Sequence, residues 1–297
     1  MRGLRFHSMQ ADVAGVAFDF VLMRQVIDAV EQWRRARTRN YIVLTNPHSV
    51  MLCRRDEQMR RATLTAGLTL PDGVGVVLAA ELLGYGRQHR VTGPALMIDV
   101  CDRGRDIGLR HFFYGGGEGV ADELARRLTS QFDGLIVAGT CCPPFRNLSE
   151  AEDADIVDRI NASRADIVWV GLGAPKQEKW MRAHLGEIAV PAMIGVGAAF
   201  DFHSGNVKWA PKWIRKFGIE WAYRLACEPR RMWRRNLDSP LFLMHVLMQA
   251  AGNRLRSLLH RTPQPERQLS PAEMAHGMAD EGVAMDVHEQ PAEMLVG

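Results

Sequence analysis

Asp72 is the residue in this sequence whose type and position best suit acid–base chemistry. It stands between Pro71 and Gly73, where a strand is expected to give way to a helix. A carboxylate at such a corner can act as a general base that takes a proton from an attacking hydroxyl. An aspartate there can equally serve as the N-cap of the following helix. The residues alone leave both interpretations open.

A second polar group, Lys176-Gln177-Glu178, follows a Gly-x-Gly-x-Pro corner at the start of an expected helix. Backbone N–H groups at a helix start favour anions such as a diphosphate, so these residues are candidates for binding one. The alternative is that they are ordinary exposed positions of a first helical turn. Asp201 and His203 follow the next strand, and each is either a binding residue or a structural one.

Three arginines, Arg224, Arg231 and Arg234, are spaced by seven and three residues. On one helix they would share a face, beside Trp221 and Trp233. Guanidinium groups next to tryptophans suit a phosphate at a membrane interface. A solubilising helix face is the alternative, and the local shortage of acidic residues argues against it.

The charge of the chain is unevenly distributed, although its net charge is only +3. Twelve basic residues fall within 208–261, against three acidic ones. This region therefore predicts an anionic partner, which is a phosphate, a membrane surface or nucleic acid.

The segment 165–201 contains the elements that position the Lys176-Gln177-Glu178 group. Two apolar runs, Asp166–Val170 and Ala192–Val196, each end in glycines, and a helix-like stretch lies between them. This is the pattern of a βαβ unit, in which both strands are parallel. Both glycine turns are then expected at the carboxyl edge of one sheet, where open α/β folds bind ligands.

Strands alternate with helices over the rest of the first two hundred residues. The chain is therefore predicted to be α/β, with a mostly parallel, Rossmann-like sheet and helices on both faces. The strands are expected at 15–18, 41–44, 68–70, 111–114 and 135–139, and the helices at 21–35, 50–62, 76–83, 95–105, 120–131 and 150–163. We expect a catalytic domain at 1–205, a basic helical C-terminal appendage at 206–262 and a flexible tail at 263–297.

Several common site types are missing from the sequence. The dinucleotide fingerprint is not completed at Gly115–Gly119, Gly171–Gly173 or Gly195–Gly197, and no Walker A motif is present. Nucleotide binding without either motif remains open, and we expect it. Asp153-Ala154-Asp155 is interpreted as a solvated helix start, and no metal or cofactor is expected.

The five cysteines and the absence of a signal peptide favour a reduced, cytosolic chain. The apolar run Leu241–Ala251 is too short to span a bilayer.

Seven motifs, in order from about residue 15 to 235, resemble the WecG/TagA/CpsF glycosyltransferases, family 26. They are PDGVGVVLA, RVTG, FFYGGGEGVADELARRL, PPF, VGLGAPKQEKWM, GVGAAFDFHSGNVKWAPKW and GIEWAYRLACEPRRMWRR. The resemblance implies an inverting, metal-independent transfer of a sugar from a UDP-sugar. It implies an acceptor sugar on a polyprenyl diphosphate, at the inner face of the bacterial plasma membrane.

The resemblance also implies roles for individual residues. Asp72 matches the proposed base, Gln177 a sugar or diphosphate contact, and Arg224, Arg231 and Arg234 the arginines that bind the lipid diphosphate. Arg90 is a candidate helper near the leaving group. The remaining candidates for substrate binding are Thr45, Asn46, Gly73, Gly75, Gly93, Gly116, Gly117, Gly173, Lys176, Glu178 and Asp201.

Three positions depart from the family pattern. Thr45 directly precedes Asn46, where Thr-x-Asn is usual, and one residue reverses the face of a strand. Ala95 stands where many members have aspartate. Trp209 stands where the arginine of Lys-Arg-Ala-Pro is common, which removes a cation near the site.

A different class of function is a nucleotide-responsive protein that binds nucleic acid through the basic, aromatic segment. The clustering of that segment at one end, its tryptophans and the adjoining apolar run Leu241–Ala251 favour a lipid instead. The favoured hypothesis therefore expects no nucleic acid, a peripheral location at the inner membrane face, and possible self-association of the appendage.

Overall fold

The computed structural model describes residues 8–259, except for the side chains of Lys212, Lys216, Arg231 and Arg234. By its internal contacts the chain divides into one unit at 1–251 and a second at 252–297. Helix α13 (Asp238–Leu259) begins in the first unit and ends in the second. The tail predicted at 263–297 lies outside the described residues, and the functional boundaries at 205 and 262 stay predictions.

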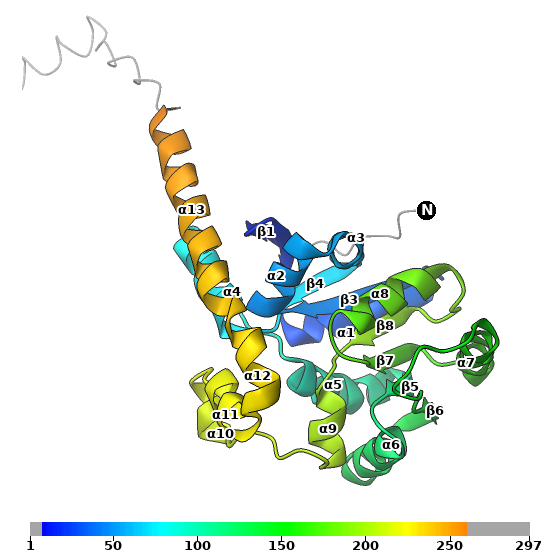
Figure 1. The fold of residues 1–297 in the computed structure, drawn as a ribbon. Coiled ribbons are helices and arrows are strands. Elements are labelled where there is room, and N and C mark those ends of the chain that lie inside the picture. Colours follow the sequence, from blue (N-terminus) through cyan, green and yellow to red (C-terminus); the bar gives the residue numbers. More distant parts are fainter. Residues whose placement is uncertain (1–7, 260–297) are drawn as a thin grey trace, which may run out of the picture. The chain divides into compact units, whose positions relative to one another are not determined.

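A six-stranded parallel sheet forms the centre of the first unit, in the order β4-β3-β8-β7-β5-β6 (Figure 1). The strands are β3 (Asn40–Thr45), β4 (Leu68–Pro71), β5 (Arg110–Gly115), β6 (Ile136–Cys141), β7 (Ile167–Gly171) and β8 (Ala192–Gly195). Strands β7 and β8 pair in parallel at the middle of the sheet. Both the α/β class and the central βαβ unit are thereby confirmed.

Helices cover both faces of this sheet, as the sequence predicted. Along β3, Ile42 and Leu44 point into one hydrophobic layer, and Tyr41 and Val43 point into the other. The first layer is covered by α1 (Met23–Arg35), α5 (Gly93–Arg103), α6 (Val120–Gln131) and α9 (Ala199–Ser204). The second is covered by α7 (Glu150–Ser163) and α8 (Lys176–Ala183), and the short turns η1 (Gly104–Ile107) and η2 (His184–Gly186) follow α5 and α8.

The N-terminal region differs from the prediction in two places. A single strand was expected at 15–18, but β1 (Met9–Val13) and β2 (Val16–Phe20) form an antiparallel hairpin apart from the main sheet. One helix was expected at 50–62, but the structure has two, α2 (Pro47–Arg55) and α3 (Glu57–Leu64), and Asp56 lies between them. The Asp56 carboxylate accepts the backbone N–H of Met59 and so caps α3.

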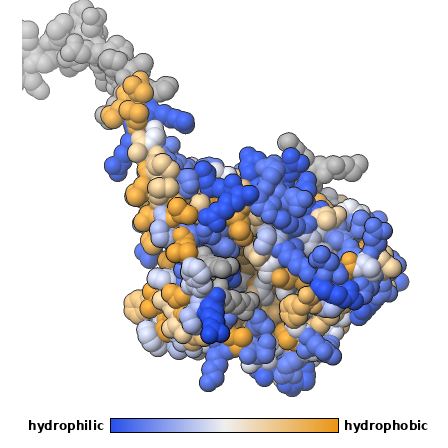
Figure 2. Space-filling view, in the orientation of Figure 1, coloured by the Kyte–Doolittle hydropathy of each residue, from blue (hydrophilic) through white to orange (hydrophobic). Residues whose placement is uncertain are grey.

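The basic segment is helical, as expected, and packs onto the rest of the first unit. Its helices are α10 (Lys212–Lys216), α11 (Glu220–Cys227), α12 (Pro229–Asn236) and α13. Phe242 and Val246 of α13 are buried in a third apolar cluster with the β1–β2 hairpin and α4 (Val74–Leu82). Figure 2 shows hydrophobic residues gathered on α13 and on α10–α12. Within residues 8–259, no helix has both the length and the hydropathy needed to cross a bilayer.

Candidate functional site

Asp72 lies at the carboxyl edge of the sheet, directly after β4. Its backbone N–H donates to the carbonyl of Thr45 at the end of β3, at 3.1 Å. The N-cap interpretation is not seen, because α4 begins after Gly73 and no side chain caps it. Burial raises the pKa of the Asp72 carboxyl, and the neighbouring Arg90 charge opposes that rise. Hydrogen bonds from the Gly93 backbone and the Asn46 side chain oppose it as well.

Asn46 orients the Asp72 carboxyl through its own role as the N-cap of α2. Its Oδ1 accepts the backbone N–H of Ser49 at 3.1 Å, so its amide nitrogen is the atom that can donate to Asp72. Thr45, one residue earlier, is buried, and its hydroxyl has no hydrogen-bond partner within the described part of the chain. The two side chains therefore lie at the same corner, although only Asn46 touches the carboxylate.

Three predicted glycines let the backbone approach closely around Asp72. A Cβ at Gly73 or Gly75 would come within 2.9 Å of the Pro47 ring. A Cβ at Gly93, the first residue of α5, would lie 3.0 Å from the carbonyl oxygen of Val196. These glycines therefore serve to pack α4 and α5 against neighbouring corners, which positions the Gly93 N–H for the Asp72 carboxylate.

Arg90 connects the carboxyl edge of the sheet to the basic segment. Its Nη1 donates to Glu220 of α11 at 2.8 Å, and its Nη2 donates to the carbonyl of Arg215 at 3.1 Å. The Glu220 charge raises the pKa of Asp72 further. Asp72, Arg90 and Glu220 therefore form one electrostatic group made by both parts of the chain.

Gln177 and Glu178 are buried, so the interpretation as exposed helix positions is wrong for both. The backbone N–H of Gly173 donates to Gln177 Oε1 at 3.2 Å, and Gln177 Nε2 donates to Glu178 Oε1 at 2.9 Å. Burial raises the pKa of the Glu178 carboxyl to about 7. Its Oε2 has no partner among residues 8–259. Lys176 is exposed at the first position of α8.

Glycines also allow the central strands to end side by side. A Cβ at Gly115, whose φ is +133°, would lie 2.6 Å from the backbone of Gly171. Gly116 has a φ of +78° and packs against Val120. A Cβ at Gly117 would lie 3.5 Å from the Phe145 ring, which is an ordinary contact. The ends of β5 and β7 thereby lie directly against each other just before α6. A substrate role for these glycines stays a prediction.

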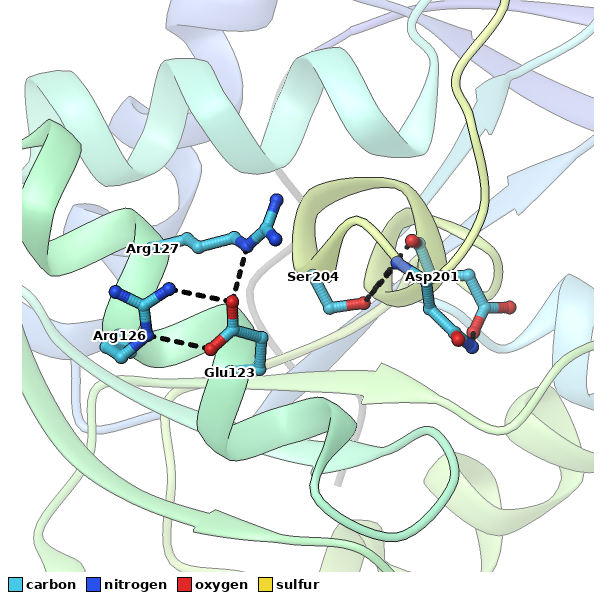
Figure 3. A network of polar contacts seen from close by, with 6 residues as sticks. Glu123, Arg126, Arg127, Asp201 and Ser204 are labelled. Atoms are coloured by element: carbon cyan, nitrogen blue, oxygen red, sulfur yellow. Dashed lines mark hydrogen bonds and ion pairs between the residues drawn. The ribbon is translucent and has the colours of Figure 1, made fainter.

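Asp201 and His203 lie on α9, and both make contacts within the protein. The Asp201 carboxylate accepts from the Asn206 side chain at 3.2 Å, and its carbonyl accepts from the Ser204 hydroxyl (Figure 3). His203 Nε2 lies 2.8 Å from the carbonyl of Pro94, so Nε2 carries the proton. Figure 3 also shows Arg126 and Arg127 of α6 paired with Glu123 beside α9. A substrate contact by Asp201 stays a prediction.

The three arginines of the basic segment do not lie on one helix, contrary to the prediction from their spacing. Arg224 is in α11, which ends at Cys227, and Arg231 and Arg234 are in α12. Pro229 explains the break, because the residue before a proline is disfavoured in helical conformation. Arg224 is half-buried, and the side chains of the other two lie outside the described residues.

Asp153-Ala154-Asp155 lies at the acidic start of α7, as expected, and Asp153 also makes contacts within the protein. Its carboxylate accepts from Trp180 Nε1 at 3.4 Å and lies 2.7 Å from His184 Nε2, which joins α7 to α8. Asp155 is exposed, as expected. In the part of the chain that the structure describes, no three His, Cys, Asp or Glu side chains are placed to hold a metal ion.

Sequence reasoning missed Glu220 and Arg215 as neighbours of the site. The signal for Glu220 was its isolation, since it is one of only three acids within 208–261. In the structure, this acid pairs with Arg90. No local pattern indicated Arg215 as a neighbour of the site. Its carbonyl reaches Arg90 and its guanidinium lies over the Trp209 ring only because the chain folds back on itself.

Comparisons with known proteins agree with this arrangement. The model of the glycosyl transferase WecG/TagA/CpsF family matches residues 11–256. An N-acetylglucosaminyldiphosphoundecaprenol N-acetyl-beta-D-mannosaminyltransferase of Bacillus spizizenii is 33% identical over 207 residues, which cover 70% of this chain and 78% of that protein. A Staphylococcus aureus protein with the same name is 28% identical over 245 residues, covering 82% and 94% respectively. The chain belongs to the WecG/TagA/CpsF family of glycosyltransferases.

Proposed function

We propose that this enzyme transfers a sugar from a UDP-sugar to a sugar carried on a polyprenyl diphosphate, with inversion and without a metal. The donor sugar is of the N-acetylmannosamine or glucose type. Two relatives are named for transfer of N-acetylmannosamine to N-acetylglucosaminyl-diphosphoundecaprenol, which supports this acceptor class. The product belongs to the synthesis of a cell-surface polysaccharide.

The observation that carries the proposal is the environment of Asp72. A carboxylate with a raised pKa is a stronger base than an ordinary one, yet Arg90, Asn46 and the Gly93 N–H still favour its charged form. It takes the proton of the acceptor hydroxyl as that oxygen bonds to the anomeric carbon. The bond from that carbon to the UDP oxygen breaks on the opposite face, and UDP leaves.

Charge that develops on the departing UDP requires fixed donors in place of a metal. The starts of α6 and α8 lie at the carboxyl edge, next to the turns at Gly116 and Gly173. The N–H groups of Ala121, Gly173 and Gln177 there already donate within the protein, so the donors for a diphosphate are the remaining ones of these turns. Preorganised donors of this kind stabilise a leaving anion without reorganising during the reaction. We assign the UDP diphosphate to these corners and the lipid diphosphate to Arg224, Arg231 and Arg234.

We also propose that the basic segment attaches the enzyme to the inner face of the plasma membrane. Trp213 of α10, Trp221 of α11 and Phe217, which directly follows α10, are exposed among basic residues. Amphipathic helices with aromatic and cationic side chains bind anionic membrane surfaces. Binding to anionic vesicles in a flotation assay, without a mobility shift of a labelled oligonucleotide, would separate this role from the nucleic-acid alternative.

The transfer is tested by UDP release from a panel of UDP-sugars, with a short-chain prenyl-diphospho-N-acetylglucosamine as acceptor. One donor should give release that depends on the acceptor. Asp72→Asn should lower kcat by about a hundredfold to ten-thousandfold, because it removes the base. Asp102→Asn, a change of the same charge at an exposed pair on α5, should leave kcat unchanged. An Asp72→Asn variant as active as that control would refute the assignment.

A further inference from the structure

Two arginines of the basic segment lie on a stack of aromatic rings beside the site. The rings of Phe202 and Trp209 are nearly parallel, with planes 12° apart and centroids 6.1 Å apart. The guanidinium carbon of Arg215 is 3.7 Å from the centre of the Trp209 ring, which is cation–π contact. The guanidinium carbon of Arg224 is 5.6 Å from the centre of the Phe202 ring. Each ring of the aromatic stack therefore has one arginine beside it.

Each of these arginines has a buried N–H group that lacks an acceptor. The Nε atoms of Arg215 and Arg224 are shielded from solvent, and neither donates to any residue that the structure describes. A buried donor left unpaired costs free energy, so each of these groups needs an explanation, and a bound anion is one. Glu220 pairs with Arg90, and Asp201 accepts from Asn206. A guanidinium group forms strong, charge-assisted hydrogen bonds with an anion that has several oxygens, such as a phosphate.

Two chains of contacts connect Arg215 to Asp72. In the first, the Arg215 carbonyl accepts from Arg90, whose charge acts on Asp72. In the second, burial lowers the pKa of His203 and the Arg215 charge lowers it further. His203 donates to the carbonyl of Pro94, which follows Gly93, whose N–H reaches Asp72. Arg215 is therefore linked to Asp72 through Arg90 and through the Gly93–Pro94 segment.

We propose that Arg215, held against Trp209, binds a phosphate group of a diphosphate substrate together with Arg224. This inference rests on the proposed transferase function and adds a residue to it. At position 209, where the family resemblance leads us to expect an arginine, the tryptophan instead holds the guanidinium of Arg215 at its ring. Both the nucleotide donor and the lipid acceptor carry a diphosphate.

The first test measures binding of inorganic pyrophosphate to the full chain by calorimetry. Arg215→Gln should raise the Kd about tenfold or more, because a charge-assisted hydrogen bond is lost. Arg126→Gln is the matched control, since Arg126 is 66% exposed on α6 and pairs with Glu123. This readout needs no turnover, so it stands apart from the transferase proposal. Equal Kd values in both variants, or no binding by the unaltered protein, would overturn the inference.

The second test compares KM values in the transfer reaction. A higher KM for the lipid acceptor alone in Arg215→Gln assigns the site to the acceptor diphosphate, and a higher KM for the UDP-sugar alone assigns it to the donor. The double variant Trp209→Arg/Arg215→Gln should recover the lost affinity, because it returns a guanidinium to the position of the ring. A purely structural role for Arg215 predicts unchanged KM values and no recovery, which would contradict the proposal.

Discussion

Asp238→Asn should weaken the attachment of the start of α13 to α2. Asp238 is the first residue of that helix, and its buried carboxylate lies 2.5 Å from His48 Nδ1 and pairs with the Arg55 guanidinium. Burial lowers the pKa of His48, aided by the Arg235 and Arg55 charges and opposed by the carboxylate. His48 is therefore a neutral hydrogen-bond donor at neutral pH. The Asp238 carboxylate is shared by the two α2 side chains, His48 and Arg55.

The size of the effect follows from the exposure of the three side chains. Removing one partner of a fully buried ion pair costs roughly 3–5 kcal/mol, because it strands a charge. Here the Arg55 side chain is 49% exposed, so water solvates it once the pair is broken. Asparagine also keeps one acceptor oxygen for His48 or Arg55. We therefore expect a loss of about 2 kcal/mol in the free energy of unfolding, typical of a hydrogen bond to a charged group.

The assay is urea unfolding at neutral pH, combined with hydrogen exchange of the α13 amides. Asp102→Asn is the control, because its pair with Arg105 is a surface pair worth about 0.5 kcal/mol or less. In Asp238→Asn the amides around Phe242 and Val246 should exchange faster than those of α5. Equal free energies of unfolding in the two variants would refute the reasoning that the carboxylate anchors α13.

Two further predictions concern charges close to the site. Glu178 has a folded pKa of about 7 against an ordinary 4.5, so the native state binds more protons between these values and stability falls as pH rises through them. Glu178→Gln should therefore be more stable than wild type near about pH 8, by on the order of 3 kcal/mol, and this advantage should vanish below about pH 4. A difference in urea unfolding that is independent of pH would contradict this. Glu220→Gln removes a charge that raises the pKa of Asp72 and frees Arg90 to approach it. The acid limb of the pH profile of kcat/KM should then shift to lower pH, and a limb that stays in place would count against Glu220 as a neighbour of the base.

The sheet was predictable because parallel strands are buried on both faces and therefore appear as continuous apolar runs. The runs that became β7 and β8 are bounded by polar residues and glycine, so their limits were within about two residues of those observed. The position of Asp72 after β4 followed from the same rule, since the carboxyl ends of parallel strands share one edge.

What the sequence could not show depends on contacts between distant segments. The first strand, β1, is half polar, and its burial comes from packing beside β2 and α4. Lys176-Gln177-Glu178 has the local pattern of an exposed helix start, yet the fold buries Gln177 and Glu178. The Arg90–Glu220 pair joins residues 130 positions apart. Local periodicity contains no information about such pairs.

The Arg90–Glu220 pair suggests a chemical role for the basic segment, in addition to the membrane role that we propose for it. When α11 is docked, Arg90 is shared between Glu220 and the Arg215 carbonyl, and Glu220 itself raises the pKa of Asp72. Without α11, Arg90 would be free to pair with Asp72 alone. A close positive charge lowers the pKa of a carboxylate, so this pairing would make Asp72 a weaker base. Burial is the main cause of the raised pKa of Asp72, and docking of the basic segment adds to it. If Asp72 is the base, as we propose, its full strength therefore depends on the part of the chain that we assign to the lipid acceptor.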